Sequence, residues 1–456
     1  MSLGVDSIRE CLEGTIPAMV ATCSADGTPN VAYLSQVEYV DSGHVALSFQ
    51  FFNKTRQNIL VNPWVEILVI HPVTAAMYRV RARYLRTEEE GPLYERMKAK
   101  LAGIASHTGM AGVFRLLGSD IYAVQSIEPT GTRSLGEPSP GLNRLAALRR
   151  ALAKLAAAND LELLLERLLD ALALDFGIEH AIVLMVDASR ERLYTVASRG
   201  YGASGVGSEI GFGQGVIGVA ANARTPVRIC HLTLDRTYSQ AIREGVESSG
   251  NAAAIEREIA WPGLAEPHSQ LAVPVCSGED LLGVVFVESG QALRFTYDDE
   301  DALLGLATHL GVAMRQLQTS ADTPDEVAAL HKGASQPRGE PVRVRYFDAD
   351  GSVFVGDEYL IKGVAGAILW KLLREHRQSG RVDFTNRELR LAGDIRLPDV
   401  SDNLEARLVL LTRRLAERGG CLSIEKTGRG RFRLIVERPL LLEAAGQRTP
   451  GATPPR

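Results

Sequence analysis

Two stretches rich in proline, glycine and serine interrupt this chain, and they constrain its fold more than any other feature. The first is Glu128–Pro140 and the second is Thr319–Pro341. Proline and glycine break both helices and sheet ladders, so neither stretch belongs inside a regular element. The chain of 456 residues is therefore expected to fold as three units, in line with a prior of about 150 residues per domain. A third such stretch, residues 446–456, is expected to be a disordered tail.

The composition predicts a globular protein without a membrane partner. Apolar residues make up 45% and charged residues 23% of the chain, as in ordinary folded domains. The longest uncharged stretches, Ile210–Ala223 and Leu303–Met314, fall short of the roughly 20 apolar residues that span a bilayer. The first residues, MSLGVDSIRECLEG, carry acids where a secretory signal would be apolar, so no export signal is expected.

The cysteines argue against a disulfide framework and against a structural zinc site. Their number is odd, they are scattered, and no CxxC or CxxH pair occurs. A reducing cytoplasm without a resident metal site is therefore expected. The five are Cys11, Cys23, Cys230, Cys276 and Cys421.

The N-terminal segment is expected to form a small antiparallel barrel with one short helix. Turn signals such as Ala25-Asp26-Gly27 and Asp41-Ser42-Gly43 separate the apolar runs. The helix is predicted over Asn53–Val61 and ends before Asn62-Pro63, because proline disfavours the helical conformation of the residue before it. The predicted strands are Ala18–Cys23, Val31–Val40, His44–Gln50, Trp64–His71 and Ala76–Arg86.

The start of the predicted helix combines a cation, Lys54, with a hydroxyl, Thr55. Together with the free N–H groups of a first helical turn they would form a site for a phosphate-sized anion. Taken alone, the same residues also suit a solvated helix start.

The segment over about residues 5–130 resembles the pyridoxamine 5'-phosphate oxidase-like family of flavin-binding split barrels. Its most specific part is the Lys-Thr-x-x-Asn-x-x-x-Asn-Pro run that begins at Lys54. The resemblance implies a dimeric split β-barrel over residues 1–135 with FMN at the subunit interface. The other matching segments are Thr28–Ser35, Val45–Gln50, Val65–Val69 and Tyr78–Arg81.

The same resemblance implies which residues hold the cofactor. Lys54, Thr55 and Arg56 would hold the FMN phosphate, the segment Asn30–Tyr33 would run past the isoalloxazine ring, and two residues of a neighbouring strand would line the site. The full set is Asn30, Val31, Ala32, Tyr33, Ser48, Phe49, Lys54, Thr55 and Arg56. Haem and deazaflavin, which the fold family also binds, remain alternatives.

The end of this segment departs from the true oxidases. Those enzymes close with a stretch bearing Trp and Arg that helps to hold the pyridoxal substrate, whereas here the segment ends with Ile121–Glu128. Oxidation of pyridoxamine phosphate is therefore not expected.

Residues 141–157 are predicted to form a connecting helix. Leu145, Leu148, Leu152 and Leu155 are spaced alternately by three and four, which is an a/d seam of about two heptads. Two readings stay open, a dimerisation helix and a helix docked on its own chain.

The central segment, residues 158–318, contains the glycine-rich run Gly213–Gly218 and the apolar runs Leu271–Val275 and Leu282–Val285. In the order and spacing of these runs it resembles a GAF domain, an α+β sensor fold. GAF domains bind small molecules and often dimerise, so a small-molecule ligand is expected. The glycines of Gly213–Gly218 mimic a dinucleotide fingerprint but lack the preceding parallel strand, so they are interpreted as turn residues. The matching segments are Gly213–Gly218, Arg224–Val227, Leu271–Val275, Leu282–Val285 and Phe295–Asp301.

Cys230 and His231 lie where a GAF pocket wall often runs. They could bind haem or a metal or act as a redox-sensing thiol, or they could be ordinary strand and loop residues.

The third segment, residues 341–440, is basic while the rest of the chain is acidic. It holds 19 Lys and Arg against 14 Asp and Glu, a net charge of +5 in a chain whose total is −5. Paired strands, three helices and a final hairpin resemble the winged-helix output domain of response regulators. That resemblance implies a recognition helix in Asn403–Leu415 and a wing in Glu425–Arg433.

The expected DNA contacts are polar residues on the outer side of that helix and cations of the wing. The helix departs from the pattern because Val409 and Leu410 make it unusually apolar. A winged helix that contacts protein is therefore the alternative. The expected contacts are Asn403, Arg407, Arg413, Arg414, Lys426, Arg429 and Arg431.

Together these features predict a homodimeric, cytoplasmic one-component regulator. A flavin-type barrel and a GAF domain would sense redox state or a small ligand and control a DNA-binding winged helix. The competing hypothesis is an FMN-dependent oxidoreductase regulated by its GAF domain. No catalytic residue is assigned, because the chain shows no phosphate loop, no HExxH motif and no hydrolase-like Ser, His and Asp set.

Overall fold

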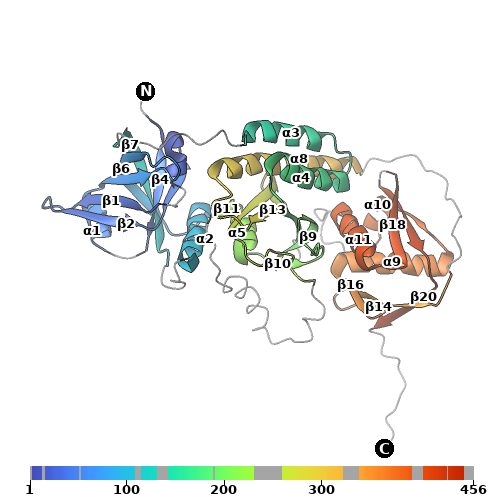
Figure 1. Ribbon diagram of the computed structural model, residues 1–456. Coiled ribbons are helices and arrows are strands. Elements are labelled where there is room, and N and C mark those ends of the chain that lie inside the picture. The colour runs from blue at the N-terminus through green and yellow to red at the C-terminus, as the bar shows by residue number, and fades with distance from the viewer. Residues whose placement is uncertain are drawn as a thin grey trace, which may run out of the picture.

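The computed structural model describes residues 3–12, 16–50, 53–107, 115–130, 142–187, 191–230, 259–321, 338–392, 404–428 and 430–445. Figure 1 shows three groups of elements along the chain, which we call the N-terminal, central and C-terminal units. The N-terminal and central units are each built around one antiparallel sheet, the C-terminal unit contains two sheets, and the central unit lies between the other two.

The N-terminal unit is a seven-stranded, barrel-like antiparallel sheet in the order β2-β1-β5-β6-β7-β4-β3. The predicted single strand Val31–Val40 is wrong, because the chain breaks there into β2 and β3, which lie at opposite edges of the sheet. The strands are β1 (Ala18–Cys23), β2 (Pro29–Leu34), β3 (Val37–Asp41), β4 (His44–Phe49), β5 (Trp64–Ile70), β6 (Met77–Glu88) and β7 (Gly118–Pro129). The helices are the 3-10 helix η1 (Val5–Leu12), α1 (Lys54–Val61) and α2 (Pro92–His107).

The central unit has a six-stranded sheet in the order β10-β9-β8-β13-β12-β11 with helices on both faces. Alternate strand residues face α3, α4 and α8 on one side and α5 on the other, as the two-residue period of a strand requires. The strands are β8 (His180–Asp187), β9 (Arg192–Arg199), β10 (Glu209–Gly211), β11 (Val227–Ile229), β12 (Ser269–Ser277) and β13 (Asp280–Ser289). The helices are α3 (Arg144–Ala156), α4 (Leu161–Phe176), α5 (Gly215–Ala223) and α8 (Tyr297–Ala321).

The connecting helix α3 packs on its own chain. Leu155 is buried against α4 and α8, and Leu148 and Leu152 pack against the same core. Leu145, the first leucine of the seam, is 77% exposed. The structure thus shows the docked arrangement, in which the seam contributes to the core of the central unit.

The glycine run beside the central sheet serves tight turns, as expected. Gly213 and Gly215 have φ angles of 76° and 60°, in the left-handed region that favours glycine. Gly218 lies so close to Gly211 that a Cβ atom on it would sit 2.4 Å from the Gly211 carbonyl oxygen.

The C-terminal unit follows the predicted order of strands, three helices and a hairpin. It has a four-stranded sheet, β16-β15-β14-β20, and a three-stranded sheet, β17-β19-β18. The last strand extends the unit beyond the expected bound at residue 440, because β20 pairs in parallel with β14. The strands are β14 (Val342–Phe347), β15 (Ser352–Val355), β16 (Glu358–Ile361), β17 (Asp383–Thr385), β18 (Leu422–Gly428), β19 (Arg431–Val436) and β20 (Leu440–Ala445). The helices are α9 (Gly363–Ser379), α10 (Asn386–Arg390) and α11 (Leu404–Arg418).

Tyr297 joins the N-terminal and central units. It opens α8, yet it is 3% exposed and belongs to the hydrophobic core of the N-terminal unit. Its hydroxyl accepts a hydrogen bond from the Tyr39 backbone N–H at 3.3 Å. The guanidinium groups of Arg9 and Arg228 lie 4.8 and 4.2 Å from the centre of its ring.

Glu38 of β3 is the buried counter-charge of this junction. It is 1% exposed, and its carboxylate lies 2.8 Å from Lys100 Nζ and 3.1 Å from Arg96 Nε, both on α2. Burial alone would raise the pKa of Glu38, but the charges of Lys100 and Arg96 outweigh it and hold the pKa below its ordinary value.

No helix in the described part of the chain is both long and apolar enough to cross a bilayer.

Replacing Glu38 with Gln should weaken this junction. The variant leaves Lys100 and Arg96 without their carboxylate, and an unbalanced buried charge typically costs about 3–5 kcal/mol. We expect the first thermal unfolding transition of the full chain to occur at a lower temperature, measured by calorimetry. Glu128→Gln, an exposed residue paired with Arg79, is the control and should leave that transition in place.

The pH dependence follows from the lowered pKa of Glu38. Its contribution is fully present above the ordinary glutamate pKa of about 4.3 and is lost as pH falls through the lowered folded-state value. The native chain should therefore lose more stability on acidification below about pH 4 than Glu38→Gln does. Equal losses in the two proteins would contradict the role assigned to Glu38.

Candidate functional site

The first turn of α1 lies beside β2 and carries the residues predicted to bind an anion. Asn53 caps the helix, since its side-chain oxygen accepts the Arg56 N–H at 3.1 Å. Asn30 of β2 donates its side-chain N–H to Thr55 Oγ1 at 3.0 Å, which leaves the Thr55 hydroxyl proton free to donate outward. Lys54 is exposed, with no ion pair among the described residues. Cation, hydroxyl and helix start thus meet as the sequence predicted.

Strand β2 offers an exposed apolar face next to this helix start. It is an edge strand whose Val31 and Tyr33 side chains are 66% and 78% exposed, while Ala32 between them is half-buried. A free strand edge with apolar side chains suits a flat ring or a second protein surface. Asn30 links this strand to α1, but its side chain lies on the face of β2 opposite to Val31 and Tyr33, because successive strand residues point to opposite faces.

Arg56 does not face the same anion. Its guanidinium lies 2.6 Å from Asp120 Oδ1, donates to Thr87 at 3.0 Å and stacks 4.3 Å from the centre of the Phe49 ring. Burial raises the pKa of Asp120 above its ordinary value, and bonds from Thr87 and Arg56 oppose that rise. The geometry assigns Arg56 and Phe49 to a contact inside the N-terminal unit, and phosphate binding by Lys54 and Thr55 stays a prediction.

Ser48 lies among buried polar atoms that have no partner in the described part of the chain. Gln50 donates its side-chain N–H to Ser48 Oγ at 3.2 Å, and Ser119 stands opposite Ser48 on β7. The side-chain oxygens of Gln36, Gln50 and Ser119 make no hydrogen bond to any described residue. Buried atoms of this kind are normally satisfied by water or a ligand.

Cys230 sits at the junction of the N-terminal and central units rather than in an open pocket of the described structure. Its thiol is buried and accepts a hydrogen bond from Arg228 Nη1 at 3.0 Å. Arg228 is fully buried and pairs with Glu300 at 2.8 Å. His231 lies outside the described residues, so the ligand role of this pair stays a prediction.

The expected recognition helix, α11, packs on the central unit. The Arg407 guanidinium lies 2.9 Å from Asp187 Oδ2 and 4.0 Å from the centre of the Tyr194 ring. Arg413 donates to the Val196 backbone oxygen at 3.0 Å.

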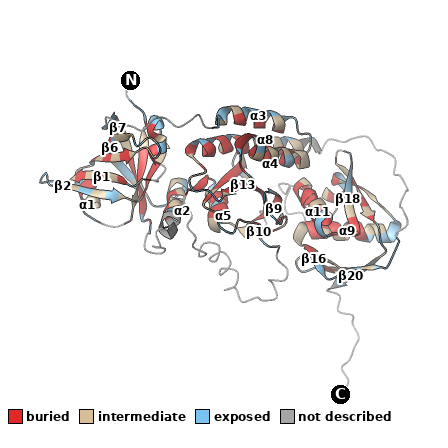
Figure 2. Ribbon diagram, viewed as in Figure 1, coloured by how far each residue is buried: buried red, intermediate tan, exposed pale blue. Residues whose placement is uncertain are grey.

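The expectation of an exposed polar face is wrong for Arg407 and Arg414, which are 5% and 7% exposed. Arg414 is held within the C-terminal unit, where it donates to the Leu360 backbone oxygen at 3.0 Å. Figure 2 shows α11 coloured largely as buried.

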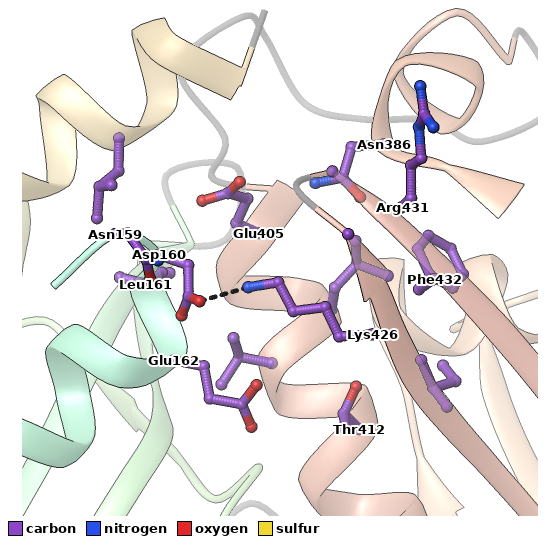
Figure 3. Close-up of a pocket in the computed structure, with 16 residues that line it drawn as sticks. Asn159, Asp160, Leu161, Glu162, Asn386, Glu405, Thr412, Lys426, Arg431 and Phe432 are labelled. Atoms are coloured by element: carbon purple, nitrogen blue, oxygen red, sulfur yellow. Dashed lines mark ion pairs between the residues drawn. The ribbon is translucent and has the colours of Figure 1, made fainter. Parts of the chain in front are cut away.

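The hairpin β18–β19 also faces the central unit. Lys426 Nζ lies 2.5 Å from Asp160 Oδ2, the residue that caps α4 (Figure 3). A cavity of about 260 Å³ lies between α4, α11 and the hairpin, with Arg431 in its wall. Asn403 and Arg429 lie outside the described residues.

No pattern in the sequence indicates the partners of these cations. Two of these partners, Asp187 and Tyr194, belong to strands, and the third, Asp160, caps a helix. Each lies more than 200 residues from the cation that it contacts. No group of three or more His, Cys, Asp or Glu that could hold a metal occurs among the described residues.

Two family profiles match separate parts of the chain. Residues 5–124 match pyridoxamine 5'-phosphate oxidase, and residues 158–315 match the GAF domain. Both resemblances are thus confirmed, and the chain carries a pyridoxamine 5'-phosphate oxidase-like N-terminal domain followed by a GAF domain.

Among curated proteins, an uncharacterized protein of Methanocaldococcus jannaschii is 36% identical over 95 residues, which make up 19% of this chain and 62% of that protein. The chain therefore spans less than two thirds of the length of this relative.

Solved structures give two likenesses to single domains. The GAF domain of an Acinetobacter phosphoenolpyruvate-protein phosphotransferase covers 41% of this chain and 100% of its own length, at 20% identity and a TM-score of 0.31. An FMN-binding protein from Syntrophomonas wolfei subsp. wolfei covers 27% of this chain and 85% of its own, at 16% identity and a TM-score of 0.24. Since both scores are below 0.5, the domain assignment rests on the family profiles.

The Arg56–Asp120 pair should behave as a structural ion pair. Arg56→Ala leaves a buried carboxylate without its cation, which should lower the free energy of unfolding by about 3 kcal/mol. The double variant Arg56→Ala with Asp120→Asn should recover part of that loss, because the uncompensated charge is gone. The free energies of unfolding of the single and double variants are measured by urea titration of the full chain, with circular dichroism as the signal. Equal stability of Arg56→Ala and the native chain would show that the pair contributes nothing.

Proposed function

We propose that this chain is a homodimeric regulator whose N-terminal domain binds FMN, whose GAF domain binds a small ligand, and whose C-terminal unit is a DNA-binding winged helix. The observation that carries the proposal is the position of the GAF domain, which shares a buried contact with each neighbour. Tyr297 of the GAF domain is part of the N-terminal core, and α11 packs against β9 and α4. A ligand-dependent change in the GAF domain would therefore reach both other units.

The flavin assignment rests on the match to pyridoxamine 5'-phosphate oxidase and on the residues beside β2. The Lys54 ammonium and the Thr55 hydroxyl suit the phosphate of FMN, and the exposed face of Val31 and Tyr33 suits its ring system. The unpartnered oxygens near Ser48 suit polar ring atoms. A bound flavin would supply reversible electron transfer. The exposed β2 edge also suits a second copy of the chain, which supports the homodimer.

The DNA-binding assignment rests on the order of elements in the C-terminal unit and on its charge. Three helices followed by the β18–β19 hairpin fit the winged-helix plan, and residues 341–440 carry a net charge of +5. Lys426 and Arg431 stand on the hairpin, where a wing would meet phosphates.

Substituting the side chains proposed to bind the phosphate should lower the affinity for FMN but not for riboflavin, which has the same ring system and lacks the phosphate. We expect Lys54→Ala and Thr55→Val to weaken FMN binding by about ten- to a hundredfold, as the loss of a charge-assisted hydrogen bond implies. Riboflavin binding should stay unchanged. Lys98→Ala, which removes an exposed lysine from α2, is the matched control. Flavin fluorescence titration measures all four proteins, and an equal loss for both flavins would contradict the phosphate assignment.

Two measurements on the purified full chain test the proposal as a whole: its absorption spectrum and its binding to duplex DNA. A flavin spectrum together with salt-sensitive binding to duplex DNA is the expected result, because phosphate contacts release counterions. A protein that takes up no added FMN would overturn the flavin assignment. A bound flavin that turns over with a reductant and an acceptor, in a protein that binds no DNA, would instead favour an oxidoreductase.

A further inference from the structure

The α11 helix is the element from which the proposed DNA contacts would come, and in this structure its polar side faces the GAF domain. Arg407 is 5% exposed between Asp187 and Tyr194, and Arg413 donates to the Val196 backbone oxygen. A helix held in this way cannot enter a DNA groove, because a groove must admit the whole helix face.

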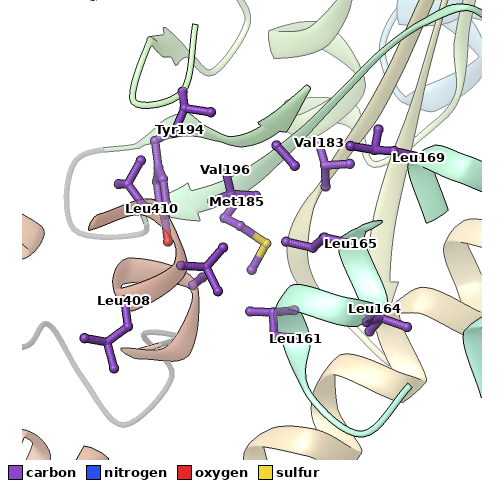
Figure 4. Close-up of a cluster of buried hydrophobic side chains, with 14 of the residues drawn as sticks. Leu161, Leu164, Leu165, Leu169, Val183, Met185, Tyr194, Val196, Leu408 and Leu410 are labelled. Atoms are coloured by element: carbon purple, nitrogen blue, oxygen red, sulfur yellow. The ribbon is translucent and has the colours of Figure 1, made fainter. Parts of the chain in front are cut away.

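Apolar contacts accompany these polar ones. Leu408 and Leu410 of α11 lie in one hydrophobic cluster with Met185 and Tyr194 of the GAF sheet and Leu161 of α4 (Figure 4). Leu410 is 4% exposed. This contact accounts for the apolar character of α11 in the sequence, since a helix that is apolar on more than one side is buried on more than one side.

The hairpin is held by the same surface. Lys426 pairs with Asp160 at the start of α4, so the proposed helix contacts and a proposed wing contact are engaged together. The two GAF carboxylates that pair with these cations are Asp160 and Asp187, and a carboxylate, like a DNA phosphate, is an anion that lysine and arginine bind.

The interface also contains polar residues and a cavity. The cavity, of about 260 Å³, lies between α4, α11 and the hairpin (Figure 3). The residues at its rim include Glu162, Glu405 and Lys426, and interfaces of this polar kind join domains that move relative to one another.

We propose that duplex DNA and the GAF domain compete for the same face of α11 and the β18–β19 hairpin, so that the docked arrangement is the DNA-free state of the chain. The inference rests on the proposed DNA-binding function. Asp160 and Asp187 act as intramolecular substitutes for DNA phosphates, and any ligand that weakens the GAF surface raises DNA affinity.

The test removes the two carboxylates from the GAF side and leaves the C-terminal unit unchanged. Asp160→Asn keeps the α4 cap, because an asparagine side chain also accepts the Leu163 N–H, and Asp187→Asn removes the charge that faces Arg407. The matched control is Glu279→Gln with Asp280→Asn, which removes two charges from the exposed β12–β13 turn of the same domain.

Two measurements are made on the full chain. Hydrogen exchange reports whether α11 is released, and anisotropy of a fluorescein-labelled duplex of about three helical turns at low salt reports DNA affinity. We expect the Asp160→Asn, Asp187→Asn double variant to exchange faster in α11 and to bind the duplex about tenfold more tightly than the native chain. The control pair should match the native chain within about twofold.

Each other outcome overturns a defined statement. Unchanged exchange in α11 would show that the two carboxylates do not hold the helix and would overturn the inference. Faster exchange with DNA binding equal to that of the native chain would overturn the competition and leave the DNA-binding function standing. Faster exchange with no DNA binding in any of the proteins would overturn the DNA-binding function itself.

Discussion

The guanidinium of Arg407 loses its contact with water when α11 packs on the GAF domain. The position of the C-terminal unit depends on the groups that compensate this buried charge. A buried cation needs both an opposite charge and hydrogen-bond acceptors, since desolvation otherwise costs several kcal/mol. Asp187 supplies the charge and the Tyr194 ring supplies a favourable face. Both belong to the GAF domain, so this buried cation ties the C-terminal unit to its neighbour.

The junction on the other side of the GAF domain follows the same rule. Glu38 and Lys100 of the N-terminal domain and Arg228 and Glu300 of the GAF domain are charged groups gathered around the ring of Tyr297. Charges of both signs enter from both domains. On this side each buried ion pair lies within one domain, and the contact between the domains runs through Tyr297, whose ring faces Lys100 and whose hydroxyl accepts the Tyr39 N–H.

The site at β2 and α1 was largely predictable because its parts are close in the sequence. The helix that begins beside Lys54 and Thr55 and its end before Pro63 are local features that the sequence predicts, and the structure shows this helix with Asn53 as its cap. Arg56 was the exception, because its partner Asp120 lies on a strand that becomes its neighbour only when the sheet forms.

The sequence by itself determined the three units, the types of most helices and strands, and the two family resemblances, because periodicity, caps and glycine turns act over a few residues. It also showed that Val409 and Leu410 make this helix unusually apolar for a recognition helix. Only the tertiary structure decided where α11 packs and that β20 completes the first sheet of the C-terminal unit. Those outcomes depend on burying surfaces and pairing charges across long separations in the sequence, and no local pattern encodes which distant carboxylate a buried arginine will meet.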